Sequence, residues 1–275
     1  MGKHFPWRRY GLLIIGATLT LALILLAVLA PWVTPFSPYE INIPDRLQGP
    51  SAAHWLGTDE LGRDTFTRTV YAGRISLMVG AVAVGIGIFG GILIGLTSAY
   101  FGGAYDMLFM RNMDMLYAFP AILLAIVIMA GLGTSMINAM IAIGIIFIPG
   151  FARLARATTQ VVLRQQFVEA ALTTGMSTRR LLFREILPNI ATPLMVQGAI
   201  GFAYAVLIES ALSFLGLGAQ PPEPSWGEMI NSGRGQMAQA PWLGIVPGAA
   251  IFLSVLGFNT LGDGLRDFFD PHLRD

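Results

Sequence analysis

Long apolar runs separated by short polar segments dominate this chain. Six stretches approach or exceed the ~18–20 apolar residues that an α-helix needs to cross a bilayer. They lie near residues 11–31, 75–100, 115–132, 136–152, 193–217 and 243–261. The pattern predicts an all-α polytopic membrane protein with six transmembrane helices.

The first stretch follows three basic residues, Lys3, Arg8 and Arg9, as the apolar part of a cleaved signal peptide would. Its apolar run is longer than that of the usual signal peptide, and Ala30-Pro31 is a poor cleavage context. We therefore expect an uncleaved span, with residues 1–33 forming an N-terminal tail and the first transmembrane helix.

The basic residues predict the orientation, because inner loops of membrane proteins carry an excess of Lys and Arg. With the N-terminus inside, twelve of the 17 Lys and Arg residues fall on inner segments and five on outer ones. Both termini would then be cytoplasmic, with residues 267–275 as a cytoplasmic tail. Three outer arginines, Arg63, Arg68 and Arg74, precede the second span, where long side chains can snorkel to the interface.

Composition narrows the class further. The chain is 55% hydrophobic and only 12% charged, against about 25% charged in soluble domains, so it has no room for a large soluble domain. It contains no cysteine, which excludes disulfides and cysteine-bound metals. A net charge of +1 gives no reason to expect a nucleic-acid partner.

The outer segment, residues 34–74, is rich in proline at first and then charged. Near its end, Phe66, Val70 and Tyr71 recur at helical spacing, which predicts an amphipathic helix lying on the outer interface. The alternative is a solvated loop whose arginines contact lipid phosphates.

A polar, arginine-rich loop at residues 153–192 interrupts the apolar pattern between the fourth and fifth stretches. It reads as two short helices broken at Gly175, with Ser177 capping the second and Pro188 marking its end or a kink. Helices this short are marginal in water, so a partner should pack on them, and Ala170 and Ala171 offer a small, close-approach surface.

This loop resembles the EAA loop of type I ABC importer permeases: Glu-Ala-Ala, three residues, Gly, nine residues, Ile, one residue, Leu-Pro. The residues on that spacing are Glu169, Ala170, Ala171, Gly175, Leu187 and Pro188. Glu185 stands in the Ile position, with Ile186 after it. The resemblance implies that these residues dock into a cleft on an ATPase subunit. It also implies that residues 75–266 form a type I permease core with cytoplasmic coupling helices.

Four further stretches resemble the C-type permease subunits of dipeptide, oligopeptide, glutathione and nickel importers. The first is Gly57-Thr58-Asp59-Glu60-Leu61-Gly62-Arg63-Asp64, which resembles their Gly-Thr-Asp-x-x-Gly-Arg-Asp element. The others are Tyr100–Pro120, Leu212–Gly227 and Phe258–Pro271. Together they cover about residues 55–272, and residues 34–74 would then be periplasmic.

The resemblance also implies partners. We expect a bacterial inner-membrane complex of this chain with a second, homologous permease subunit, forming a heterodimer. Two ATP-binding subunits would carry the ATP and Mg²⁺, and a periplasmic or lipid-anchored solute-binding protein would dock outside. Membrane lipid would surround the spans. The solute stays open between a peptide, glutathione and a nickel chelate.

The sequence itself argues against nucleotide binding by this chain. Lys3 is the only lysine and no glycine-rich phosphate loop precedes it, so any ATPase is another polypeptide. Gly85-x-Gly87-x-x-Gly90 matches the dinucleotide fingerprint only as a string, because it lies inside an apolar span. Gly87, Gly91 and Gly95 instead predict close helix packing, since small residues four apart let helix backbones approach in lipid.

Catalytic and metal sites are not expected either. His4, His54 and His272 lie outside the spans and form no ligand cluster. No histidine or lysine lies within a span to act as the base for Ser135. We therefore expect a non-enzymatic transport subunit that binds no cofactor of its own.

Glu209 is the main charge expected inside a span, where an ionised group is expensive. It would contact the substrate or a moving helix, or it would be a neutral or paired structural carboxyl near the outer end. The alternative function is a proton-coupled secondary transporter with Glu209 as the proton site. Such proteins usually carry several intramembrane ionisable groups and inverted repeats, whereas this chain has essentially one buried acid and no clear repeat.

Overall fold

The computed structural model describes residues 7–269. Lys3, His4, His272 and residues 270–275 of the expected C-terminal tail lie outside this range, as does the end of the Phe258–Pro271 resemblance. Between Trp7 and Phe269 the chain is helical apart from its loops and one isolated antiparallel bridge, Thr58 to Asp64. The expected all-helical, multi-span architecture is confirmed.

The elements in chain order are α1 Trp7–Val28, α2 Ala30–Val33, the 3₁₀ turn η1 Ile43–Asp45, α3 Thr65–Phe101, α4 Gly103–Tyr117, α5 Ala121–Leu132, α6 Met136–Val162, α7 Gln166–Thr173, α8 Thr178–Arg180, the π-helical turn η2 Leu181–Ile186, α9 Leu187–Phe214, α10 Trp226–Gly233, the 3₁₀ turn η3 Arg234–Gln236 and α11 Trp242–Phe269.

Within the described residues, five helices are long and apolar enough to cross a membrane. A sixth crossing exists if α4 and α5 count as one broken span, since they pass the same criterion together but bend by 97° at their junction. The predicted straight span 115–132 is therefore wrong. Pro120 lacks a backbone N–H and disfavours the helical conformation at Phe119, which explains the break.

The interfacial helix expected within residues 34–74 is also wrong. α3 begins at Thr65, where the Asp64 side chain accepts a hydrogen bond from the Thr67 N–H at 2.8 Å and caps the helix. It then runs unbroken for 37 residues, so Phe66, Val70 and Tyr71 form its first turns and the expected boundary at residue 75 falls inside it. At 1.5 Å per residue α3 is about 55 Å long, which exceeds the ~30 Å hydrocarbon core.

Other spans are longer than predicted. The fourth stretch extends to Val162 in α6, the fifth starts at Leu187 in α9, and the sixth extends to Phe269 in α11. Each extension adds polar residues to the helix end, and hydropathy does not distinguish such residues from a loop.

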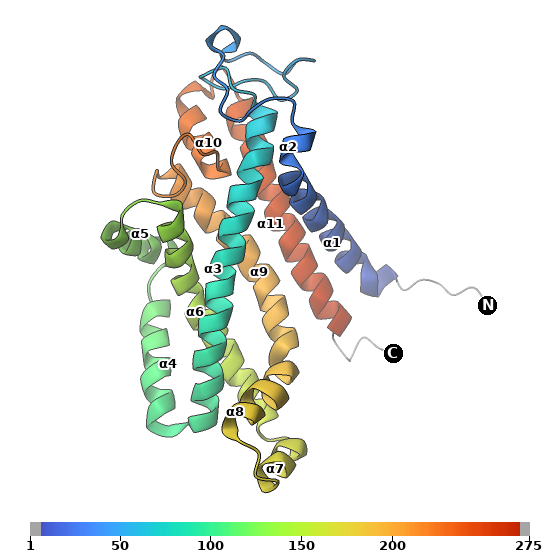
Figure 1. The fold of residues 1–275 in the computed structure, drawn as a ribbon, viewed down its shortest axis with the longest axis vertical. Coiled ribbons are helices and arrows are strands. Elements are labelled where there is room, and N and C mark those ends of the chain that lie inside the picture. The colour runs from blue at the N-terminus through green and yellow to red at the C-terminus, as the bar shows by residue number, and fades with distance from the viewer. Residues whose placement is uncertain (1–6, 270–275) are drawn as a thin grey trace, which may run out of the picture.

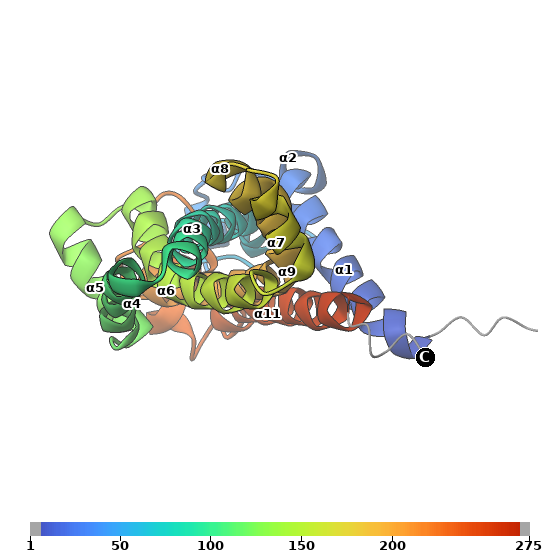
Figure 2. The ribbon, with the colours of Figure 1, turned by 90° about the horizontal axis from the view of Figure 1, so that it is seen from below.

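Figures 1 and 2 show α3, α6 and α9 in the middle, with α4 and α5 on one flank and α1 and α11 on the other. We name the two ends by their helices. The α10 end carries the loops of residues 34–64 together with α10, and the α7 end carries α7 and α8 (Figure 1). α1 begins and α11 ends in the half of the molecule nearer the α7 end.

Small residues bring α3 and α6 into contact. A β-carbon at Gly87 would lie 2.6 Å from the Phe147 Cβ, and one at Gly91 would lie 2.8 Å from the Ala152 amide nitrogen. A β-carbon at Gly95 would lie 2.8 Å from the Ala155 Cβ. The contact thus depends on the absence of side chains at these three positions.

A second glycine seam joins α1 to α11. A β-carbon at Gly16 would lie 2.6 Å from the Leu261 Cα, and one at Gly264 would lie 2.9 Å from the Leu12 carbonyl carbon. α1 is therefore attached chiefly to α11.

Candidate coupling site

The polar loop folds as a short helix ended by a left-handed glycine. Gly175 has φ +74°, its N–H donates to the Leu172 carbonyl at 3.0 Å, and the Met176 N–H donates to the Ala171 carbonyl at 3.2 Å. This pair of bonds is the Schellman motif, which satisfies the last carbonyls of a helix. The predicted break at Gly175 and the short helix before it are confirmed, but the second short helix is wrong, because the helix that starts at Thr178 continues without a break to Phe214.

Ser177 occupies the N-cap position of α8, but its side chain makes no capping hydrogen bond. α8 is followed directly by the π-helical turn η2, after which the Leu187 N–H donates to the Leu182 carbonyl. Pro188 is the second residue of α9, so it marks neither an end nor a sharp kink. The π turn precedes a residue that has no N–H to donate.

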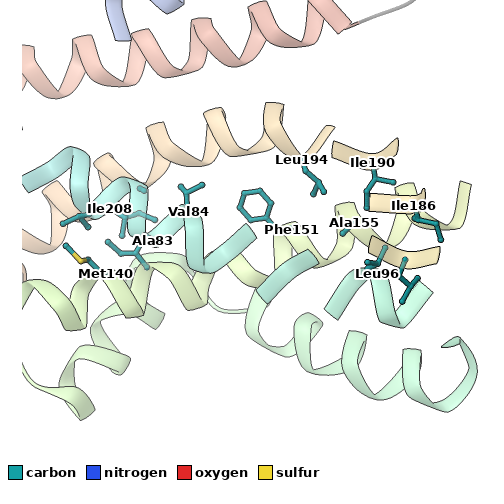
Figure 3. Packing of buried hydrophobic residues seen from close by; sticks show 14 of the residues in the cluster. Ala83, Val84, Leu96, Met140, Phe151, Ala155, Ile186, Ile190, Leu194 and Ile208 are labelled. Atoms are coloured by element: carbon teal, nitrogen blue, oxygen red, sulfur yellow. The ribbon is translucent and has the colours of Figure 1, made fainter. Parts of the chain in front are cut away.

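Two faces of the loop differ in burial. Val168, Leu181 and Ile186 are at most 1% exposed and belong to the same hydrophobic core as Leu96 of α3 and Phe151 of α6. Figure 3 shows Leu96, Ile186 and Ile190 packed together. The loop is therefore built into the core of the spans on one side, so displacement of α7 and α8 would move the core helices with them.

The other face of the loop is open. Glu169, Ala170 and Gly175 are exposed, and Leu172 is 48% exposed although it is apolar. Ala171 is half-buried against the core, as is Leu187, and Pro188 is exposed. The predicted coupling residues therefore divide into an exposed side and a side packed against the core.

The loop is also tied to α3 and flanked by ion pairs. The Tyr100 hydroxyl lies 3.1 Å from the Thr178 hydroxyl, which joins the last turn of α3 to α8. Arg156 of α6 donates to both oxygens of Asp106 in α4, at 2.6 and 2.5 Å. Arg153 donates to Asp114 at 2.6 Å. These two bridges attach α4 to α6 near the loop, and sequence reasoning missed them because it treated the arginines only as inner charges.

At the α10 end, Arg63 and Arg68 belong to a buried ion-pair network instead of snorkelling as the sequence predicts, whereas Arg74 is exposed. Arg68 is 1% exposed; it donates to Glu228 of α10 at 3.0 Å and lies 3.5 Å from Asp59. Arg63 donates to the same Asp59 at 2.6 Å. Burial raises the pKa of Glu228, and the Arg68 charge opposes that rise.

The network fixes the outer loop onto the helices. Its loop, residues 57–64, turns at Gly62 with φ +74°, and the bridge from Thr58 to Asp64 closes it. The His54 Nδ1 lies 3.0 Å from Asp64, and the Trp242 indole donates to the Thr58 carbonyl at 3.0 Å. Substituting one charged residue of this network would leave the charge of its partner unpaired, which is costly in a buried site.

Glu209 is 1% exposed between α3 and α9. Ser76 of α3 donates to its carboxyl at 2.9 Å, and Ser213, one turn further along α9, donates at 2.8 Å. The carboxyl therefore links α3 to α9 near the α10 end through hydroxyl donors. No Lys, Arg or His forms an ion pair with it among residues 10–269.

A cavity of about 410 Å³ lies between α9, α6 and the α4–α5 junction. Its walls are apolar apart from Gln197 and Tyr204 of α9 and Tyr117 of α4. Polar side chains on a membrane helix generally face a partner or a water-filled cavity rather than lipid. The cavity is thus where a polar solute would be tolerated inside the spans.

The sequence is similar to known transport proteins over most of its length. Residues 87–275 match the family described as binding-protein-dependent transport system inner membrane component, and residues 7–50 match the N-terminal TM domain of oligopeptide transport permease C. The dipeptide transport system permease protein of Alkalihalophilus pseudofirmus is 47% identical over 276 residues, which cover 98% of this chain and 91% of that protein.

Two glutathione transport system permease proteins are similar at comparable levels. That of Pectobacterium atrosepticum is 43% identical over 272 residues, covering 98% of this chain and 90% of the relative. That of Escherichia coli O157:H7 is 44% identical over 275 residues, covering 98% and 91%. These matches confirm the resemblance to importer permeases that the motifs indicate.

Proposed function

Because the chain belongs to the family of binding-protein-dependent transport system inner membrane components, we propose that its Glu169–Pro188 loop couples a separate ATPase to the spans. The chain is a multi-pass inner-membrane permease subunit of an importer of this kind. The observation that carries the proposal is the two-sided loop, whose exposed side is free to dock while its buried side is continuous with the core.

The proposed complex contains this chain, a second homologous permease as a heterodimeric partner, two ATP-binding subunits and a solute-binding protein. ATP and Mg²⁺ reside on the ATP-binding subunits, and this chain performs no catalysis. The α7 end and both termini face the cytoplasm, and the α10 end faces the binding protein. ATP binding displaces α7 and α8, and the core transmits that displacement to α3 and α6 as a switch between two states.

The cavity lined by Gln197, Tyr204 and Tyr117 is the proposed contribution to the translocation path. It offers an amide and two phenol groups and no charged side chain, which suits solutes recognised through peptide bonds. The names of the relatives favour a dipeptide or glutathione as solute. A nickel chelate stays an alternative that the names of these relatives do not favour.

Proton-coupled transport through Glu209 has less support. Its carboxyl is 1% exposed and already accepts two hydroxyl hydrogen bonds. It lines neither the 410 Å³ cavity nor the larger groove described below. A proton site needs a route to water, and this one has none in either cavity.

The test uses the assembled complex in proteoliposomes with Glu169→Lys and Gly175→Arg. We expect both variants to assemble, to lose uptake and to lose the ATPase stimulation that binding protein and solute cause. The loss should be at least about tenfold, the effect of removing one well-placed interface contact. Normal stimulated ATPase activity and uptake in both variants would refute the coupling role.

Gly216→Arg is the matched control for Gly175→Arg. Gly216 also ends a helix with a positive φ, +77°, and makes the same pair of hydrogen bonds, with its N–H donating to the Ser213 carbonyl and the Leu217 N–H donating to the Leu212 carbonyl. It has open space around it, so the substitution imposes similar backbone strain away from the coupling loop. Strain alone would impair both variants equally, whereas docking predicts that only Gly175→Arg uncouples hydrolysis from uptake.

A further inference from the structure

A groove of about 650 Å³ opens on the side of the molecule where α1 and α3 diverge. Its walls come from Ile24 and Val28 of α1, Met78 and Ala81 of α3, and Phe258 of α11. Phe202 and Phe258 stack at 3.9 Å between ring centroids and close the back of the groove. The volume falls within the ~300–1,000 Å³ of sites that hold small organic ligands.

The position of the groove in the membrane is defined by its residues. It lies along the final turns of α1 and the first part of α3, toward the α10 end. Trp32, just beyond α1, is 78% exposed, and exposed tryptophans favour the membrane–water interface. The groove therefore runs from headgroup level into hydrocarbon, where an apolar cleft would be filled by acyl chains.

Charged groups lie only at the headgroup end of the groove. Arg74 is exposed and lies over the Tyr71 ring, with 5.8 Å from its Cζ to the ring centroid. It forms no ion pair with any side chain in the described part of the chain. A guanidinium at headgroup level lies within reach of lipid phosphates, and its planar donors match a phosphate.

The second charge at the groove is negative. The Tyr39 hydroxyl donates to the Glu223 carboxylate at 3.0 Å, and both residues line the groove with Arg74. This carboxylate keeps acceptor capacity for a further donor. A primary ammonium supplies N–H donors to it, whereas a choline group has none and an uncharged glycerol group would leave the carboxylate without a counter-charge.

We propose that this groove holds a phospholipid with an ethanolamine headgroup, taken from the leaflet at the α10 end. Arg74 binds the phosphate, Glu223 and Tyr39 bind the ammonium, and one acyl chain lies against Met78, Ala81 and Phe258. The lipid fills the space between the α1–α11 pair and α3.

The test uses a photoreactive benzophenone amino acid at Met78, which is 45% exposed in the groove, in the full complex within native membranes. Phe89, also on α3 and 70% exposed, is the control site for surrounding lipid. Adducts are identified by mass spectrometry, and their headgroups are compared with the total lipid extract. We expect ethanolamine lipid at Met78 to be enriched about tenfold, the factor of one charge-assisted hydrogen bond.

Three variants sharpen the result. Arg74→Gln and Glu223→Gln should each reduce the enrichment toward the bulk ratio without changing the yield of complex. Ala81→Phe should fill the groove and reduce all lipid adducts at Met78. A bulk headgroup ratio at Met78, or adducts there mainly with another protein such as the second permease, would overturn the proposal.

Discussion

Substituting Gly87 by alanine tests whether α3 and α6 depend on direct backbone contact. The new β-carbon would lie 2.6 Å from the Phe147 Cβ and 3.2 Å from a ring carbon of Phe151. Ordinary contact begins at 3.4 Å, so the helices would have to separate by about 0.8 Å, because a β-carbon cannot rotate away. Overpacking of this kind costs about 1–3 kcal/mol, or about a 5–150-fold change in the folded-to-unfolded ratio.

Gly85→Ala is the control for this substitution. Gly85 lies two residues earlier on the same helix and has nothing within 4 Å of an added β-carbon, so it shares the change in helix propensity but not the collision. Unfolding of each purified variant by SDS in mixed micelles, followed by tryptophan fluorescence, gives the difference. Equal stability of the two variants would show that the α3–α6 contact does not require glycine and would refute the packing argument.

Three further perturbations have expected outcomes. Arg68→Leu should destabilise the protein by about 3–5 kcal/mol because it leaves the buried Glu228 carboxylate unpaired; adding Glu228→Leu should recover part of the loss in the same unfolding assay, and no recovery would contradict the pairing. Glu209→Gln should retain yield of the complex and uptake, whereas Glu209→Leu should lower the yield because two buried hydroxyls lose their acceptor; a Gln variant that assembles fully but does not transport would show that the charge itself is needed. Cysteines at Ser177 and Ser51 should react with an impermeant thiol reagent from the cytoplasmic and outer sides respectively, against no background from this cysteine-free chain; the reverse labelling would overturn the orientation.

The sequence was most informative where a local pattern decides the structure. Apolar runs long enough to span a bilayer gave the helices, and Gly175 gave the left-handed turn between α7 and α8 because few other residues adopt that conformation at low cost. Glu209 was expected either to contact the substrate or a moving helix, or to be a neutral or paired structural carboxyl, and the structure surrounds it with serine hydroxyls.

The failures come from interactions between distant parts of the chain. Arg68 and Glu228 are 160 residues apart, so nothing local indicated that the arginine would be buried rather than snorkelled. The same network joins the first turns of α3 to α10. Phe66, Val70 and Tyr71 therefore belong to the start of α3, and their helical spacing alone could not distinguish this from a separate interfacial helix. The bend at Pro120 was missed because residues 115–132 contain no charged residue, so the apolar pattern continues through the break.

The central claim is that the exposed side of the Glu169–Pro188 loop contacts an ATP-binding subunit. The most direct measurement attaches a photoreactive maleimide to Leu172→Cys, the only cysteine in this subunit, with Ser51→Cys as the control on the outer segment. The account predicts that mass spectrometry finds the Leu172 adduct on the ATP-binding subunit, with a yield that changes between nucleotide-free and vanadate-trapped complexes. An intact, transport-competent complex whose Leu172 probe reacts only with lipid, solvent or other subunits would contradict it.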